Sequence, residues 1–127
     1  MNSIATITLL VPSYQAGIDF FVTTLGFELL ENTALAPGKR WVLVSSGPQG
    51  CNLLLAEATT PAQQAAIGQQ AGDRVFGFIS TDDFERDYRA YSAAGVVFNE
   101  QPRHESYGTV AVFTDPFGNK WDLIQYS

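Results

Sequence analysis

The sequence predicts an α+β fold in which two βαβββ modules pair into a curved mixed sheet around a cleft. Short apolar segments of alternating character indicate strands, and two segments with apolar residues three and four apart indicate helices. The order of segments in the first half recurs in the second. With 127 residues the chain can bury about two thirds of its unfolded surface without disulfides or metal. We therefore expect one domain built from a repeat.

The first half is expected to form one strand, one helix and three strands. Residues 14–24 carry apolar side chains on one helical face, Ser13 is a suitable N-cap, and Gly26 suits the end of the helix. A turn around Pro37 and Gly38 separates the second and third strands. The four strands are predicted at residues 4–11, 27–32, 41–45 and 52–57.

The second half is expected to repeat this order after a connector at residues 59–70, where Pro61 suits the first turn of a short helix. Asp82 or Asp83 can cap the next helix, and Gly95 ends it. The apolar face of that helix consists of Phe84, Tyr88 and Tyr91. The strands are predicted at residues 75–80, 96–99, 110–114 and 120–125, with a hairpin turn at residues 115–119.

A constant offset of 69 residues relates the two halves, because it pairs Gly26 with Gly95 and Ser46 with Asp115. We expect a single domain over residues 1–127, with a first module at about 1–58, a connector at 59–73 and a second module at about 74–127. One module exposes an apolar sheet face that it cannot cover alone. Two modules or two chains should therefore close around the cleft, and a homodimer is expected.

Composition and charge exclude several classes of function. The net charge of −6 and the scattered basic residues argue against nucleic acid and anionic membrane as partners. No apolar run approaches the roughly 20 residues of a membrane span, and the first residues lack the features of a signal peptide, so a cytoplasmic protein is expected. Cys51, the one cysteine, is expected to be a small buried hydrophobe in a strand rather than a nucleophile.

The repeat, the segment VPSYQAGIDFFVTTLGFELLE at residues 11–31 and the segment DPFGNKWDLIQ at residues 115–125 resemble the vicinal oxygen chelate superfamily. This superfamily contains glyoxalase I, extradiol dioxygenases, fosfomycin-resistance enzymes and bleomycin-binding proteins. The resemblance covers the whole chain and implies the fold. It leaves the function open, because the members include isomerases, transferases, oxygenases and binding proteins that catalyse nothing.

The resemblance also implies where a metal site would lie, since metal-using members place a His or Glu on the first strand of each module and a Glu on the fourth. The corresponding positions here are Thr6, Leu53 or Leu54, Phe76 or Val75, and Asp122. Only Asp122 can bind a metal, and divalent ions need about three or more protein donors. We therefore expect a metal-independent site and no cofactor.

A rearranged ligand set of Glu57, His104 and Asp122 is the alternative. It would support a glyoxalase-like lyase or dioxygenase that depends on a divalent metal ion. A structural or regulatory subunit without a ligand is a third hypothesis. The leading prediction is a small-molecule-binding protein of the glyoxalase/bleomycin-resistance type, and whether the chain is an enzyme stays open.

An apolar cleft suits a small hydrophobic or aromatic ligand. Phe76 and Phe78 are expected to share one face of their strand. An arginine near the mouth could hold a carboxylate, and the loop before the closing hairpin is expected to rim the cleft. The predicted ligand-binding residues are Arg40, Trp41, Phe76, Phe78, Arg103, His104 and Tyr107.

Asp122 is the one acid inside the last predicted strand, where it should point away from Trp121 and Leu123. It is a candidate catalytic residue, because an apolar surrounding would raise the pKa of its carboxyl and suit it to act as a general base. Alternatively, it accepts hydrogen bonds from Thr6 or Thr8 across the sheet and only orients the cleft.

Overall fold

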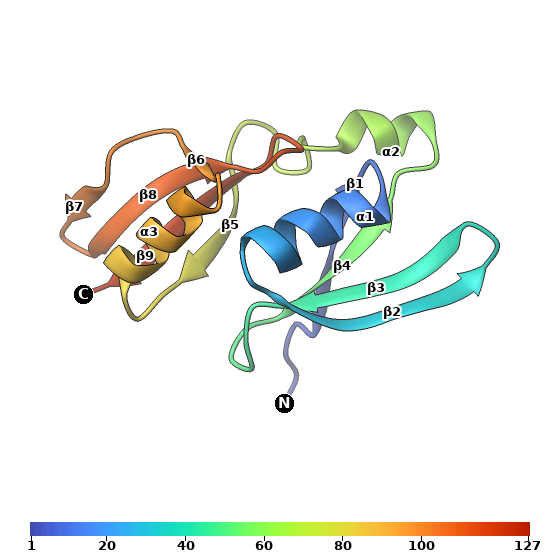
Figure 1. Ribbon diagram of the computed structural model, residues 1–127, viewed down its shortest axis with the longest axis horizontal. Coiled ribbons are helices and arrows are strands. Elements are labelled where there is room, and N and C mark those ends of the chain that lie inside the picture. Colours follow the sequence, from blue (N-terminus) through green and yellow to red (C-terminus); the bar gives the residue numbers. More distant parts are fainter. The chain divides into compact units, whose positions relative to one another are not determined.

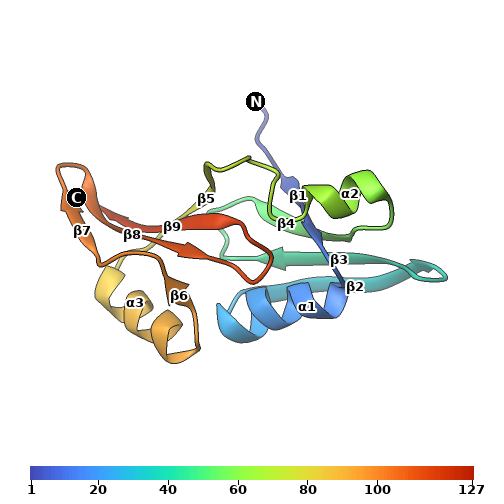
Figure 2. The same ribbon diagram turned by 90° about the horizontal axis from the view of Figure 1, so that it is seen from above.

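The computed structural model describes residues 1–127 and contains two compact units, Met1–Ile67 and Gly68–Ser127, which are described here one at a time (Figures 1 and 2). Each unit contains a mixed sheet and one principal helical segment. The division between them falls inside the predicted connector. The predicted α+β class is confirmed, and so is the βαβββ order of the first module; in the second module the strand after the helix is divided into two short strands.

The first unit is a four-stranded sheet in the order β1-β4-β3-β2. The first and the last strand along the chain, β1 and β4, pair in parallel, and the remaining pairs are antiparallel. The strands are β1 (Thr6–Val11), β2 (Glu28–Ala36), β3 (Lys39–Ser45) and β4 (Asn52–Glu57). The helices are α1 (Tyr14–Ile18), the π-helical segment η1 (Asp19–Thr24) and α2 (Pro61–Ala66).

The helix of the first unit begins and ends where the sequence predicts. The Ser13 side chain accepts a hydrogen bond from the Ala16 amide, as an N-cap does. The second half of the helix has wider turns, because the Leu25 amide donates to the Phe20 carbonyl. Gly26 then ends the helix with a φ of 81°, a conformation that glycine adopts without steric cost.

The core of the first unit lies between its helix and the sheet. The fully buried side chains come from every second position of the strands and from η1: Leu9, Val11, Phe21, Val42, Val44 and Leu55. The alternation leaves the other side chains of β1, β3 and β4 on the face away from the helix. That second face includes Trp41, Leu43 and Leu54.

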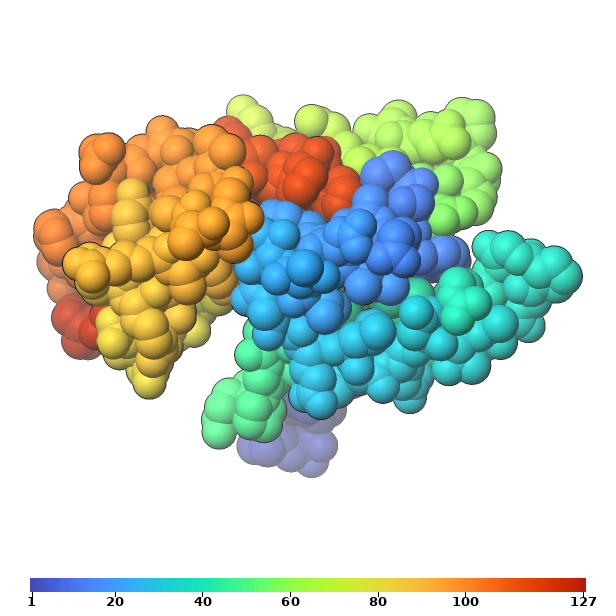
Figure 3. All heavy atoms as spheres, in the orientation of Figure 1, coloured from blue at the N-terminus to red at the C-terminus, as the bar shows by residue number.

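The hairpin of β2 and β3 carries little of this core. All nine residues of β2 are exposed, and β2 forms an edge of its sheet. Leu30 and Leu35 are 42% and 55% exposed. In the space-filling view the tip of the hairpin, coloured cyan, stands out from the rest of the first unit (Figure 3). The unit thus presents a long unpaired strand edge with apolar side chains.

The second unit repeats this topology as β5-β9-β8-β6, with a further short strand, β7, paired to β8. Its strands are β5 (Val75–Ser80), β6 (Val97–Phe98), β7 (Arg103–Glu105), β8 (Gly108–Thr114) and β9 (Lys120–Tyr126). Its helix is α3 (Phe84–Ala93), capped by the Asp83 side chain, which accepts from the Arg86 amide. The helix face toward the core includes the buried Phe84 and Tyr91.

The turn of the closing hairpin is built around Asp115, which is 3% exposed. Its carboxylate accepts hydrogen bonds from the amides of Phe117 and Asn119, from the Asn119 side chain, and from the Trp121 indole. A buried carboxylate needs this many donors to offset the loss of water. The DPFGN segment is therefore an internal framework of the fold.

The 69-residue offset holds for two strand pairs, since β1 maps onto β5 and β3 onto β8 residue for residue at their ends. It does not hold for β4 and β9, because Leu53 is buried on the helix face whereas Asp122 lies on the other face. Three expectations were wrong in detail. The second strand continues to Ala36, because it pairs with β3 almost to the Pro37–Gly38 turn. Residues 103–105, expected in a loop, pair with β8. Cys51 is exposed and precedes β4, because the buried positions of that strand begin at Leu53.

Candidate functional site

The face of the second sheet that points away from α3 carries Asp122. Trp121 and Leu123 are 5% and 0% exposed on the helix face, so Asp122 lies on the other face, as predicted. In cross-strand register it pairs with Phe78 on β5 and with Val112 on β8. An acid therefore lies between an aromatic and an aliphatic residue.

Asp122 has an unusual environment for a carboxylate. Its Oδ1 atom is buried and has no hydrogen-bond partner. Burial raises the pKa of the Asp122 carboxyl, the positive charge of Arg103 lowers it in part, and the negative charge of Glu100 raises it further. Oδ1 therefore accepts no hydrogen bond of the kind that Asp122 would make if its role were only to hold the sheet together.

Arg103 lies on β7 and is held by two neighbouring acids. Its guanidinium donates to Glu100 and, at 3.0 Å, to Glu105. Together with Tyr107, these carboxylates raise the pKa of Arg103, with Glu100 the largest cause. Arg103 pairs with Val110 on β8, and Val110 pairs with Ile124 on β9. Because Ile124 is two residues after Asp122, Arg103 lies on the same face of the sheet as Asp122, in the neighbouring row of side chains. Arg103 is already neutralised before any ligand binds.

The aromatic residues of β5 do not share one face, contrary to the expectation. A β-bulge between Val75 and Gly77 breaks the alternation. Phe76 packs edge-on against the buried Trp121, with ring centroids 5.3 Å apart. Phe78 stays beside Asp122 and is 63% exposed. Of the two, Phe78 is the residue that a ligand at Asp122 would touch.

His104 lies on the opposite face from Asp122, because it pairs with Thr109 and its Nδ1 atom is 3.3 Å from the Thr109 hydroxyl. Glu57, in the first unit, accepts a hydrogen bond from the Tyr14 amide. No three side chains of His, Cys, Asp or Glu gather as metal ligands do. Within the second unit, two of the three side chains in the rearranged ligand set, His104 and Asp122, thus lie on opposite faces of the sheet.

The first unit has an equivalent face, on which Leu54 occupies the place of Asp122. Leu54 pairs with Thr8 there, as Asp122 pairs with Phe78 in the second unit. Trp41 lies on this face and is 38% exposed. Arg40 points to the other face of β3, where its guanidinium donates to the side chain and the carbonyl of Asn32. Arg40 and Trp41, both predicted to bind the ligand, thus lie on opposite faces.

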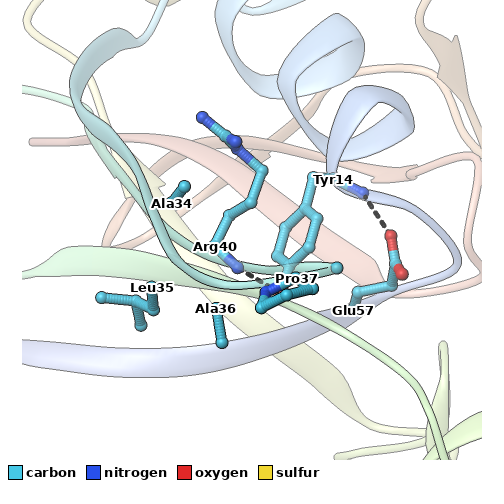
Figure 4. Close-up of a pocket in the computed structure, with 8 residues that line it drawn as sticks. Tyr14, Ala34, Leu35, Ala36, Pro37, Arg40 and Glu57 are labelled. Carbon is cyan, nitrogen blue, oxygen red and sulfur yellow. Dashed lines mark hydrogen bonds between the residues drawn. The ribbon is translucent and has the colours of Figure 1, made fainter.

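Arg40 instead borders an open pocket of about 600 Å³ in the first unit. Figure 4 shows the Tyr14 ring in its middle, between the tip of the β2–β3 hairpin and Glu57. The Tyr14 hydroxyl accepts a hydrogen bond of 3.2 Å from the Arg40 amide, which fastens the hairpin to the start of α1. The pocket is lined by Tyr14, Ala34, Leu35, Ala36, Pro37, Gly38, Arg40 and Glu57.

Sequence reasoning named Asp122 and Phe78, which the structure places side by side, but it did not indicate two other features of these faces. The pocket is formed by residues far apart in sequence, and Tyr14 gave no signal beyond its place at a helix start. Glu100 was also missed, although its spacing of three residues from Arg103 is that of an ion pair. Tyr107, predicted at the rim, is 49% exposed and interacts with Arg103.

Comparison with known proteins identifies relatives over nearly the whole chain. The sequence model described as Glyoxalase/Bleomycin resistance protein/Dioxygenase superfamily matches residues 3–123. A protein of Shewanella frigidimarina (strain NCIMB 400) is 51% identical over 126 residues, which cover 98% of this chain and 93% of that protein. None of the helices is long and apolar enough to cross a membrane.

Two solved structures share the fold. The crystal structure of UcmS2 aligns with a TM-score of 0.84 at 22% identity and covers 98% of both chains. TnmS3, described as an antibiotic binding protein from Streptomyces sp. CB03234, aligns with a TM-score of 0.80 at 26% identity. That alignment covers 100% of this chain and 98% of TnmS3.

Proposed function

The chain belongs to the Glyoxalase/Bleomycin resistance protein/Dioxygenase superfamily, and we propose that within it the protein binds a small, largely apolar organic molecule without a metal ion. The observation that carries this proposal is that each unit exposes an aromatic residue on the sheet face away from its helix, Trp41 in the first unit and Phe78 in the second. Exposed aromatic surface is favourable to cover and marks ligand sites when polar groups lie beside it.

Two further observations support binding. Beside Phe78, Asp122 keeps an unpartnered buried oxygen, and polar groups of this kind fix a ligand's orientation. TnmS3, which resembles this chain over its full length, is described as antibiotic binding. The proposed contact residues are Trp41, Phe78, Arg103 and Tyr107, while Arg40 would contact a ligand only in the hairpin pocket.

The test measures the binding of polycyclic aromatic compounds in the presence of EDTA, with fluorescence and thermal shift as the readouts. We expect saturable binding by wild type, weakened about tenfold by Phe78→Ala or Trp41→Ala, because each removes a large apolar contact. Ile4→Ala removes an apolar side chain that is 72% exposed before β1 and serves as the control. Equal affinity in all variants would contradict the proposal.

The enzymatic alternative is a lyase or dioxygenase that depends on a divalent metal. It predicts a stoichiometric metal ion in the dialysed protein and its loss in Asp122→Ala. The raised pKa of Asp122 would suit a general base in such an enzyme. Metal analysis of both proteins separates the two functions, since metal-independent binding predicts that EDTA leaves affinity unchanged.

The proposed assembly is a homodimer, supported by the unpaired edge of β2 and the exposed Leu30 and Leu35. Light scattering during gel filtration should give twice the mass of one chain. A lysine at Leu30 should dissociate the dimer, whereas Val97→Lys, at an equally apolar exposed position on β6, should not. A monomeric wild type would contradict this assembly.

We also propose a cytoplasmic location. The one thiol of the chain, Cys51, is exposed, and exposed unpaired thiols persist in a reducing compartment. Fractionation of the source cells would test this, with recovery outside the cytoplasm as the contrary result.

A further inference from the structure

Asp122 is half-buried in the second sheet, and its buried carboxyl oxygen lacks the hydrogen bond that such an atom usually makes. Its Oδ1 atom is buried and unpartnered, whereas the buried Asp115 carboxylate accepts from four donors. An unpartnered buried polar atom costs the fold free energy. A residue kept at such a cost is a candidate for a role outside folding.

The neighbours of Asp122 offer no donor to satisfy it. Phe78 and Val112 flank it in cross-strand register and are apolar. Arg103, the nearby cation, already donates to Glu100 and Glu105. Lys120, two residues earlier on β9, donates to the Asp73 carbonyl. None of these side chains donates to Oδ1 of Asp122, so a bound ligand can supply the donor.

We propose that Asp122 selects the ligand by accepting a hydrogen bond from an O–H or N–H group on an aromatic ring system. This inference rests on the proposed function, since it assumes that an aromatic ligand lies on this sheet face. The ring would pack on Phe78, which is 63% exposed, and its donor group would point at the Asp122 carboxyl. The carboxyl can turn about its Cβ–Cγ bond to meet the donor, because that torsion is broad.

The acids beside Arg103 favour a donor ligand over an anionic one. Glu100 and Glu105 neutralise Arg103 and leave the surface around Asp122 with more negative than positive groups. A ligand carboxylate would be repelled by Asp122, whereas a phenol, an aromatic N–H or an ammonium group would be attracted. The chemical class is thus a hydroxylated or aminated aromatic compound.

The experiment compares three naphthalene probes at pH 7.5: 2-naphthol, 2-methoxynaphthalene, and 2-naphthylmethylamine. In the second probe a methyl group replaces the hydroxyl hydrogen of the first and so removes the donor, and the third distinguishes a cationic donor from a neutral one. We expect wild type to bind 2-naphthol or 2-naphthylmethylamine about tenfold more tightly than 2-methoxynaphthalene, the size of a hydrogen bond to a charged group. In Asp122→Leu this ratio should fall to about one.

Two controls accompany the probes. Glu85→Gln removes one negative charge from the exposed surface of α3 and should leave the ratio unchanged. Asp122→Asn keeps an acceptor oxygen and should retain part of the preference. The thermal midpoint of Asp122→Leu should equal or exceed that of wild type, because the substitution removes an unpartnered buried atom.

Several outcomes would overturn the inference. An unchanged ratio in Asp122→Leu, with 2-methoxynaphthalene still bound, would leave the proposed function intact and refute the role of Asp122. A strongly destabilised or unfolded Asp122→Leu would show that the carboxyl serves the fold. If wild type binds none of the three probes, the proposed binding of aromatic ligands fails, and this inference fails with it.

Discussion

The two units share one topology but differ in one strand, which is β2 in the first unit and its counterpart in the second. In the first unit β2 is a single strand from Glu28 to Ala36 that pairs along β3 with two register shifts. In the second unit the equivalent stretch is broken into β6 and β7. The interruption contains Glu100 and Pro102, and proline has no amide hydrogen with which to continue a ladder.

The broken strand changes the chemistry of the sheet face beside it. Glu100, in the interruption, holds Arg103 at the start of β7, and both charges act on Asp122. At the equivalent place the first unit has Leu54 and no acid. One copy of the repeat therefore places an aliphatic side chain at this position on the fourth strand, and the other copy places a carboxyl there. Duplication preserved the topology while the two faces diverged.

The largest expected effect comes from comparing two equivalent turns, the one between β3 and β4 and the one between β8 and β9. Asp115→Ala should lower the free energy of unfolding by about 3 kcal/mol, because it leaves several buried donors without an acceptor. Ser46→Ala, at the position 69 residues earlier, changes an exposed side chain and should cost less than about 0.5 kcal/mol. Urea denaturation measures both, and equal losses would show that the two turns contribute alike.

The next comparison concerns a glycine in each unit. A Cβ atom at Gly77 would lie 2.5 Å from the Trp121 ring, which is fixed by its bond to Asp115. At Gly17 the Cβ would lie 2.9 Å from a methyl group of Leu55, which can move. Gly77→Ala should therefore cost about 2 kcal/mol and Gly17→Ala about 1 kcal/mol. Thermal unfolding with the opposite ranking would contradict this account of the packing.

A smaller effect is expected at alkaline pH in the helix of the second unit. Burial raises the pKa of the Tyr91 phenol to about 12 from a usual value near 10. The neutral phenol therefore stabilises the fold fully below pH 10, and this contribution is lost as pH rises from 10 to 12. Relative to Tyr91→Phe, wild type should lose about 1 kcal/mol by pH 11. Parallel pH dependence of the two proteins would contradict the burial effect.

The smallest expected effect concerns the carboxyl of Asp122, whose place in the first unit is taken by Leu54. The folded-state pKa of Asp122 is raised, so the fold is favoured while the carboxyl is protonated and loses stability as pH rises through that pKa. Asp122→Asn should therefore gain on wild type between pH 3 and neutrality, by a modest amount because Arg103 offsets part of the effect. A gain of wild type over the variant in this range would reverse the assigned sign.

The sequence by itself determined the order of elements and the repeat. The apolar alternation, Ser13 and Asp83 as N-caps, and glycines 69 residues apart depend on contacts within a few residues, and such local signals can be read directly. The same alternation placed Asp122 on the face opposite Trp121. The DPFGN turn was recognised, although its four hydrogen bonds to Asp115 were not.

Only the tertiary structure decided what each face carries. The bulge that turns Phe76 toward Trp121, the separation of Arg40 from Trp41, and the pairing of β7 with β8 all depend on register between strands. Register is set by contacts between distant residues, and a shift by one residue moves a side chain to the other face. For that reason the sequence could nominate Asp122, but the structure was needed to show that its buried oxygen has no partner.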